Sequence, residues 1–112
     1  MLMKEINRDM KLFKKWENPN PSLKSHFDYL IEYGFAKTYT SINGEEEIVF
    51  KNGTNSIEIY HNYGKRKVVI EVIVSCYEGR MNLGELFLGV RQPFYSITDT
   101  KQHIERYLQR YA

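Results

Sequence analysis

The sequence has little cysteine and no long apolar run. Cys76 is the one cysteine among 112 residues, so no disulfide can form within the chain, and such sparing use is typical of a reducing compartment. The most apolar run, residues 68–74, is interrupted by Glu71 and is far shorter than the roughly 20 residues that span a bilayer. Residues 1–5 lack the apolar core of a signal peptide. We therefore expect a cytoplasmic protein with no membrane segment.

The chain also lacks a strong net charge, because 16 basic residues meet 14 acidic ones and leave +2. Residues 25–59 nevertheless hold an excess of four negative charges. The basic residues of the N-terminal segment could follow a phosphate backbone, or they could form the ordinary polar side of an amphipathic helix. Acidic residues interrupt the stripe, which favours the second interpretation and disfavours nucleic acid as a partner. The basic residues are Lys4, Arg8, Lys11, Lys14 and Lys15.

No motif for a metal, a cofactor or a catalytic group is present in the sequence. His26, His61 and His103 do not lie three or four residues apart, and no Cys-x-x-Cys or His-x-His occurs. We therefore predict no metal, no cofactor and no catalytic residue. His61 shares the alternation of the apolar side of its strand and is expected to be a buried, hydrogen-bonded histidine. Cys76 is expected to be a small buried apolar residue.

Three segments have the apolar spacing of helices. The first covers residues 3–16, and two prolines follow it at 19 and 21. The second is expected to begin with Ser22 as its N-terminal cap and to end at Gly34. The third is expected to begin near Asp99, with Gln102 completing a capping pair. The predicted apolar positions are Met3, Ile6, Met10 and Phe13, then Leu23, Phe27, Leu30 and Ile31, and finally Ile104, Tyr107, Leu108 and Tyr111.

Between the second and third helical segments the apolar period changes to two. The pairs Asn43-Gly44, Asn52-Gly53 and Gly64-Lys65 predict turns between strands at 35–42, 45–51, 56–63 and 67–77, with 85–91 as a candidate fifth strand. A 13.4 kDa chain is the usual size of one domain, here residues 1–112. We predict the α+β class: an antiparallel meander of four or five strands, two N-terminal helices and one C-terminal helix.

Two-residue turns also fix which residues lie opposite each other. A turn at Gly53-Thr54 pairs Ile48 with Ile59, and a turn at Gly64-Lys65 pairs Glu58 with Glu71. One face of the sheet then forms the core, and the other mixes carboxylates with tyrosine and aliphatic residues. The core face holds Ile48, Phe50, Ile57, Ile59, Ile70 and Val72, and the second face holds Glu47, Val49, Glu58, Tyr60, Asn62, Val69, Glu71 and Ile73.

A pair of glutamates facing each other on neighbouring strands destabilises a sheet unless a cation lies between them. Three interpretations are open for Glu58 and Glu71: an acid/base pair for glycoside hydrolysis, an acidic surface for a basic partner, or a solvated pair neutralised by Lys51 and Lys67. Hydrolysis also needs a sugar cleft, which one small sheet rarely provides, so the last two are favoured. The run of glutamates at 45–47 would extend the acidic surface at a hairpin tip and could speed association with a basic protein.

The chain resembles a family in its layout. The run Phe27-Asp28-Tyr29-Leu30-Ile31-Glu32-Tyr33-Gly34-Phe35, the hairpins through Tyr77 and the closing Ile104-Glu105-Arg106-Tyr107-Leu108 resemble the small immunity proteins of bacterial polymorphic-toxin and contact-dependent growth inhibition systems. The resemblance implies a cytoplasmic protein that binds the C-terminal domain of a cognate toxin, often a nuclease, and neutralises it without catalysis. Inhibitors of basic nuclease clefts are commonly acidic, whereas this chain carries +2, so either the acidic middle acts locally or the toxin is bound away from its active site.

We therefore predict a non-enzymatic toxin inhibitor that acts by stoichiometric protein-protein interaction. Two other hypotheses stay open: a homo-oligomeric structural or regulatory domain that buries Val49, Val69 and Ile73 against a second copy, and a small RNA-binding protein. The predicted toxin interface consists of Glu45, Glu46, Glu47, Glu58, Tyr60 and Glu71.

Overall fold

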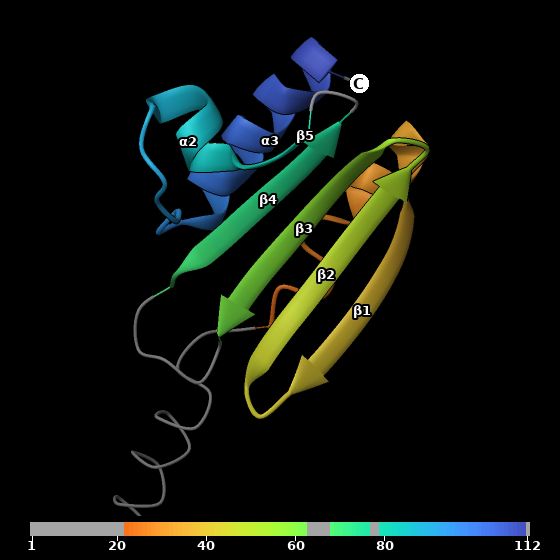
Figure 1. Cartoon of the computed structure of the whole chain (residues 1–112). Helices are drawn as coiled ribbons and strands as arrows, with labels where there is room; N and C mark the ends of the chain where they lie inside the picture. The colour runs from red at the N-terminus through yellow and green to blue at the C-terminus, as the bar shows by residue number, and fades with distance from the viewer. Residues whose placement is uncertain (1–21, 63–67, 77–78, 112) are drawn as a thin grey trace, which may run out of the picture.

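The computed structural model describes residues 22–62, 68–76 and 79–111 (Figure 1). Within them the chain forms a five-stranded antiparallel sheet with helical segments before and after it, which confirms the α+β class. The elements in order are the 3₁₀ helix η1 (Asp28–Tyr33), strands β1 (Ala36–Ile42), β2 (Glu45–Asn52), β3 (Asn55–Asn62), β4 (Ile70–Cys76) and β5 (Gly79–Asn82), and helices α2 (Leu83–Leu88) and α3 (Ile97–Tyr111).

The sheet is a meander in the order β1-β2-β3-β4-β5. Asn43 and Gly44 join β1 to β2 with φ values of 53° and 81°, the left-handed conformation that a tight hairpin turn requires at both positions. The predicted register of the next hairpin is confirmed, because Ile48 lies opposite Ile59.

The predicted register between β3 and β4 is wrong by two residues. Tyr60 lies opposite Glu71, and Glu58 lies opposite Ile73. His61 pairs with Ile70, whereas a two-residue turn at Gly64-Lys65 would pair it with Val68. Because the error is an even number of residues, each side chain still lies on its predicted face of the sheet.

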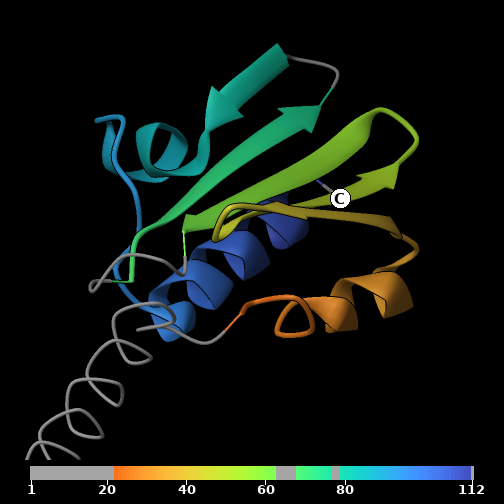
Figure 2. The ribbon, with the colours of Figure 1, turned by 90° about the horizontal axis from the view of Figure 1, so that it is seen from below.

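One face of the sheet packs against η1 and α3, and the opposite face is left open by them (Figure 2). All six predicted core residues of the sheet have 0% exposure, as do Ile104 and Tyr107 on α3. The hydroxyl of Tyr107 donates to the carbonyl oxygen of Ser75 at 3.0 Å, so a polar group that crosses the core is satisfied at the sheet.

The second predicted helix differs from the structure in its type, its start and one of its core residues. The first predicted helix, residues 3–16, lies outside the described residues. The second predicted helix is a 3₁₀ helix that begins at Asp28, because Ser22 does not cap it: the Ser22 hydroxyl instead binds Glu46 at 2.7 Å. Ile31, predicted to face the core, is 49% exposed. Gly34 ends the helix with φ of 92°, as predicted.

The region after β4 also differs from the prediction. The fifth strand is Gly79–Asn82, and most of the predicted strand 85–91 belongs to α2 and the loop after it. The side chain of Asn82 caps α2 by accepting from the Glu85 backbone N–H, and Gly89 ends it in the left-handed region. Helix α3 begins at Ile97, and Ser96 Oγ accepts from the Asp99 backbone N–H at 3.1 Å, so Asp99 and Gln102 are not the capping pair.

Candidate functional site

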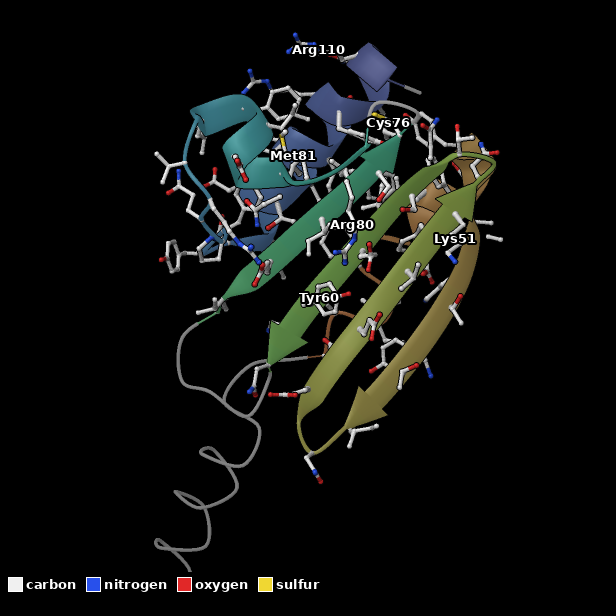
Figure 3. The ribbon with its side chains drawn as sticks, in the orientation of Figure 1. Lys51, Tyr60, Cys76, Arg80, Met81 and Arg110 are labelled. Atoms are coloured by element: carbon white, nitrogen blue, oxygen red, sulfur yellow. The ribbon has the colours of Figure 1, made fainter. Side chains whose placement is uncertain are left out.

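The sheet face opposite η1 and α3, here named the open face, carries most of the predicted interface residues. Figure 3 looks onto it, with Lys51, Tyr60 and Arg80 labelled. Its side chains alternate along β2, β3 and β4 with those of the core, so local strand geometry alone brings them to one surface. The open face consists of Glu45, Glu47, Val49, Lys51, Glu58, Tyr60, Asn62, Val69, Glu71, Ile73 and Arg80.

Glu58 is paired with an arginine that the sequence analysis did not consider. Arg80 on β5 binds both carboxylate oxygens of Glu58, Nε to Oε2 and Nη2 to Oε1, each at 3.1 Å. The Tyr60 hydroxyl donates to Glu58 Oε1 at 2.7 Å. Arg80 holds the pKa of Glu58 below its ordinary value, and burial together with Glu58 raises the pKa of Tyr60 to about 12. At neutral pH Glu58 is therefore ionised and Tyr60 is protonated.

Glu71 has a separate arginine partner. Arg91, in the loop after α2, donates from Nη2 to Glu71 Oε1 at 3.0 Å, and both side chains are well exposed. The expected repulsion between Glu58 and Glu71 is therefore wrong, because these residues do not lie opposite each other and each binds its own arginine. Neither arginine was predicted to lie on this face, because Arg80 was expected in a loop and Arg91 in a strand, residues 85–91, that does not form.

Two carboxylates of the open face have no ion-pair partner among the described residues. Glu45 and Glu47 form no ion pair with any residue in the described ranges. Glu47 Oε1 lies 3.4 Å from the Tyr60 hydroxyl, which donates at shorter range to Glu58. Glu45 is exposed, and Glu47 is half-buried. Both of these carboxylates lie in the first half of β2.

A pocket of about 290 Å³ opens at the same end of the sheet. Four of the six predicted interface residues line it, although they come from three different strands. Carboxylates, a tyrosine ring and an amide side by side in a concave surface suit the ammonium or guanidinium of a lysine or arginine. The lining residues are Glu45, Glu46, Tyr60, His61, Asn62, Val69 and Glu71.

Glu46 does not belong to the acidic surface, and its expected exposure is wrong. It lies on the core face and is 2% exposed. Its oxygens accept from the Ser22 and Tyr39 hydroxyls at 2.7 Å and from the Leu23 backbone N–H at 2.5 Å, and Oε1 lies 2.8 Å from His61 Nδ1. Burial by itself raises the pKa of Glu46, but these hydrogen bonds outweigh it and hold the pKa below its ordinary value.

The other candidate groups remain apart. His61 is buried and hydrogen-bonded, as predicted, and the ring of His103 packs on Phe94 with centroids 4.6 Å apart. Cys76 is half-buried rather than buried. Across the part of the chain that the structure describes, no group of three or more His, Cys, Asp or Glu side chains is placed to hold a metal ion.

Comparison with known proteins adds no relative. No protein family, curated protein or solved structure matches the chain. Among the helices of the described residues, none has both the length and the apolar character needed to cross a membrane.

Proposed function

We propose that the protein is an immunity protein that binds the C-terminal domain of a cognate toxin in the cytoplasm and neutralises it by stoichiometric association. The observation that supports this proposal is the pocket at the end of the sheet, which Glu45, Tyr60 and Glu71 of the open face line together with Glu46 and His61 of the core face. A basic side chain of the toxin would enter the pocket, with Tyr60 as the aromatic anchor and Glu45 as a carboxylate that forms no ion pair with the described residues.

The electrostatics of the open face favour binding over catalysis. A general acid or base works best with a pKa near the operating pH. The pKa of Glu58 is held low by Arg80, and that of Tyr60 is raised to about 12, so both shifts lead away from neutrality. The two groups instead form a fixed surface of defined charge, in which Arg80 orients Glu58 and Glu58 orients the ring of Tyr60.

A net charge of +2 does not by itself prevent the chain from binding a basic partner. Encounter rates depend on the potential at the contacting surface, and beyond about 10 Å at 0.1 M salt distant charges are screened. Glu45 and Glu47 lie together at one end of β2, and neither forms an ion pair among the described residues, so these two carboxylates would attract a basic side chain at short range although the total charge is positive.

The direct test is copurification of the tagged protein with the C-terminal toxin domain encoded by the adjacent upstream gene, followed by titration calorimetry. We expect a tight one-to-one complex and loss of toxin activity at equimolar inhibitor. Absence of binding at micromolar concentration would overturn the pairing, and salt-dependent binding of RNA instead would favour a small RNA-binding protein.

Charge reversal locates the surface. The Glu45→Lys, Glu47→Lys double variant alters no ion pair of the described residues, so we expect it to fold and to associate with the toxin about tenfold more slowly. Glu32→Lys with Glu105→Lys makes the same change in net charge on two exposed residues outside the sheet and is expected to leave the rate within a factor of about two. Equal slowing in both variants would mean that net charge alone acts, and no slowing in either would exclude this end of the open face.

A further inference from the structure

Strand β1 is an edge of the sheet, and among the described residues no strand pairs with its outer side. It pairs with β2, it stands at the end of the strand order, and Figure 1 shows it along the outer border of the sheet. The tight turn at Asn43-Gly44 makes Ile42 and Glu45 a hydrogen-bonded pair. By alternation, the backbone N–H and C=O groups of Lys37 and Tyr39 point away from β2 and toward the border.

This edge lacks the features that usually keep edge strands apart. Proteins protect such edges with prolines, bulges or free charges, but β1 reads Ala-Lys-Thr-Tyr-Thr-Ser-Ile and pairs with β2 without a bulge. Its one charge is engaged, because Lys37 Nζ lies 2.5 Å from Asp28 Oδ1 and also binds the Lys24 carbonyl oxygen. Threonine, tyrosine and isoleucine, which dominate the rest, favour strand pairing.

An exposed apolar side chain lies at the end of the edge. Ile42, the last residue of β1, is 64% exposed and lies opposite Glu45. A strand that pairs along β1 would therefore gain an apolar contact at Ile42 as well as backbone hydrogen bonds.

We propose that two copies of the chain associate through β1, antiparallel and centred on Tyr39, so that one sheet continues across the dimer axis. In this register Thr38 lies opposite Thr40 of the partner copy, and Lys37 lies opposite Ser41. No like charges meet, and the threonine pairs suit neighbouring positions of a sheet. Tyr39 meets its own copy on the axis, where both residues direct their backbone groups outward.

A second copy fits the strand better than an acidic or basic peptide, because all seven residues of β1 are matched and neither charge sign is required of the partner. The dimer interface also avoids the open face, so both pockets stay accessible. The proposal thus stands independently of the proposed function, and it differs from an oligomer built on Val49, Val69 and Ile73.

The test begins with sedimentation velocity and light scattering across a wide range of protein concentration. We expect the mass to rise from 13.4 kDa to twice that value and to stop there, because a two-fold interface closes on itself. Thr38→Lys with Thr40→Lys sets lysines opposite lysines on exposed positions and should weaken the dimer at least tenfold. Gln102→Lys with Gln109→Lys adds the same charge on exposed positions of α3 and should leave it unchanged.

Crosslinking checks the register. In a Cys76→Ser background, equal amounts of Thr38→Cys and Thr40→Cys chains should form a mixed disulfide dimer, because these positions face each other as a non-hydrogen-bonded pair with Cα atoms about 4.5 Å apart. Each variant alone should crosslink poorly. A chain that stays monomeric at its solubility limit would overturn the proposal, as would a dimer that resists the lysines, a dimer without the mixed disulfide, or open-ended growth.

Discussion

Glu46 and His61 lie directly opposite each other on β2 and β3, with Oε1 of the glutamate 2.8 Å from Nδ1 of the histidine. Neither side chain has any solvent exposure. The carboxylate also binds Tyr39 on β1 and the segment at residues 22–23 that leads toward η1. The Glu46 carboxylate thus connects β1, β2 and β3 with the segment at residues 22–23.

Replacing this carboxylate by an amide should destabilise the fold. Glu46→Gln presents an NH₂ group to donors and leaves at least one of them unsatisfied, so we expect the free energy of unfolding to fall by about 2 to 3 kcal/mol. Glu45→Gln, one residue earlier and exposed, is the matched control and should change it by less than about 0.5 kcal/mol. Urea unfolding measures both, and equal losses would remove the special role of Glu46.

The same carboxylate should make stability depend on acid. Its pKa in the folded protein is below its ordinary value of 4.5, so the unfolded chain binds the proton more readily, and the stabilisation is present in full only above that value. It should be lost as the pH falls from there through the folded pKa. Unfolding curves of the wild type and Glu46→Gln should therefore converge in acid; a constant difference down to pH 2 would contradict the assignment.

The Arg80 guanidinium should control the ionisation of Glu58. Arg80→Gln removes the largest cause of the lowered Glu58 pKa, so that pKa should rise toward its ordinary value. Lys51→Gln removes only a weaker Coulombic contribution and should raise it less. Carboxyl NMR titration follows both variants, and a larger effect of Lys51 would show that the charge on Glu58 is balanced across β2 rather than from β5.

Gly84 should be intolerant of any side chain. A Cβ there would lie 2.5 Å from the Gln92 carbonyl oxygen and 3.0 Å from Asn82 Oδ1, so α2 and the loop that returns to it would have to separate. We expect Gly84→Ala to cost about 3 kcal/mol, the upper end of the range for overpacking. Gly53→Ala meets no atom within 4 Å and should cost only the left-handed strain of about 1 kcal/mol. Thermal unfolding compares them.

The first two hairpins of the sheet were predictable from their turn residues, but the turn predicted at Gly64-Lys65 gave a register that is wrong by two residues. The turn at Gly53-Thr54 set the register of β2 and β3, and the same register already placed His61 opposite Glu46, both with core alternation. The pairing of Glu46 with His61 could therefore have been predicted from the sequence. Glu46 was instead expected to be exposed, because a run of glutamates beside a turn is typical of a solvated hairpin tip. Arg80 could not be assigned to Glu58, because that contact depends on β5 pairing with β4. The strand predicted at 85–91 was wrong because its apolar residues 86–88 resembled a strand, although Asn82 and Gly89 are the cap residues of a helix.

Every pair of neighbouring strands in the sheet is also consecutive in the chain, so each hairpin can add to the previous one as it is translated, without a search for distant segments. The core face is different, because α3 follows all five strands and supplies Ile104 and Tyr107 to cover them. Until that helix docks, the part of the core face that η1 does not cover faces water. We expect docking of α3, rather than strand pairing, to limit folding and to set the interval in which the nascent protein is prone to aggregate.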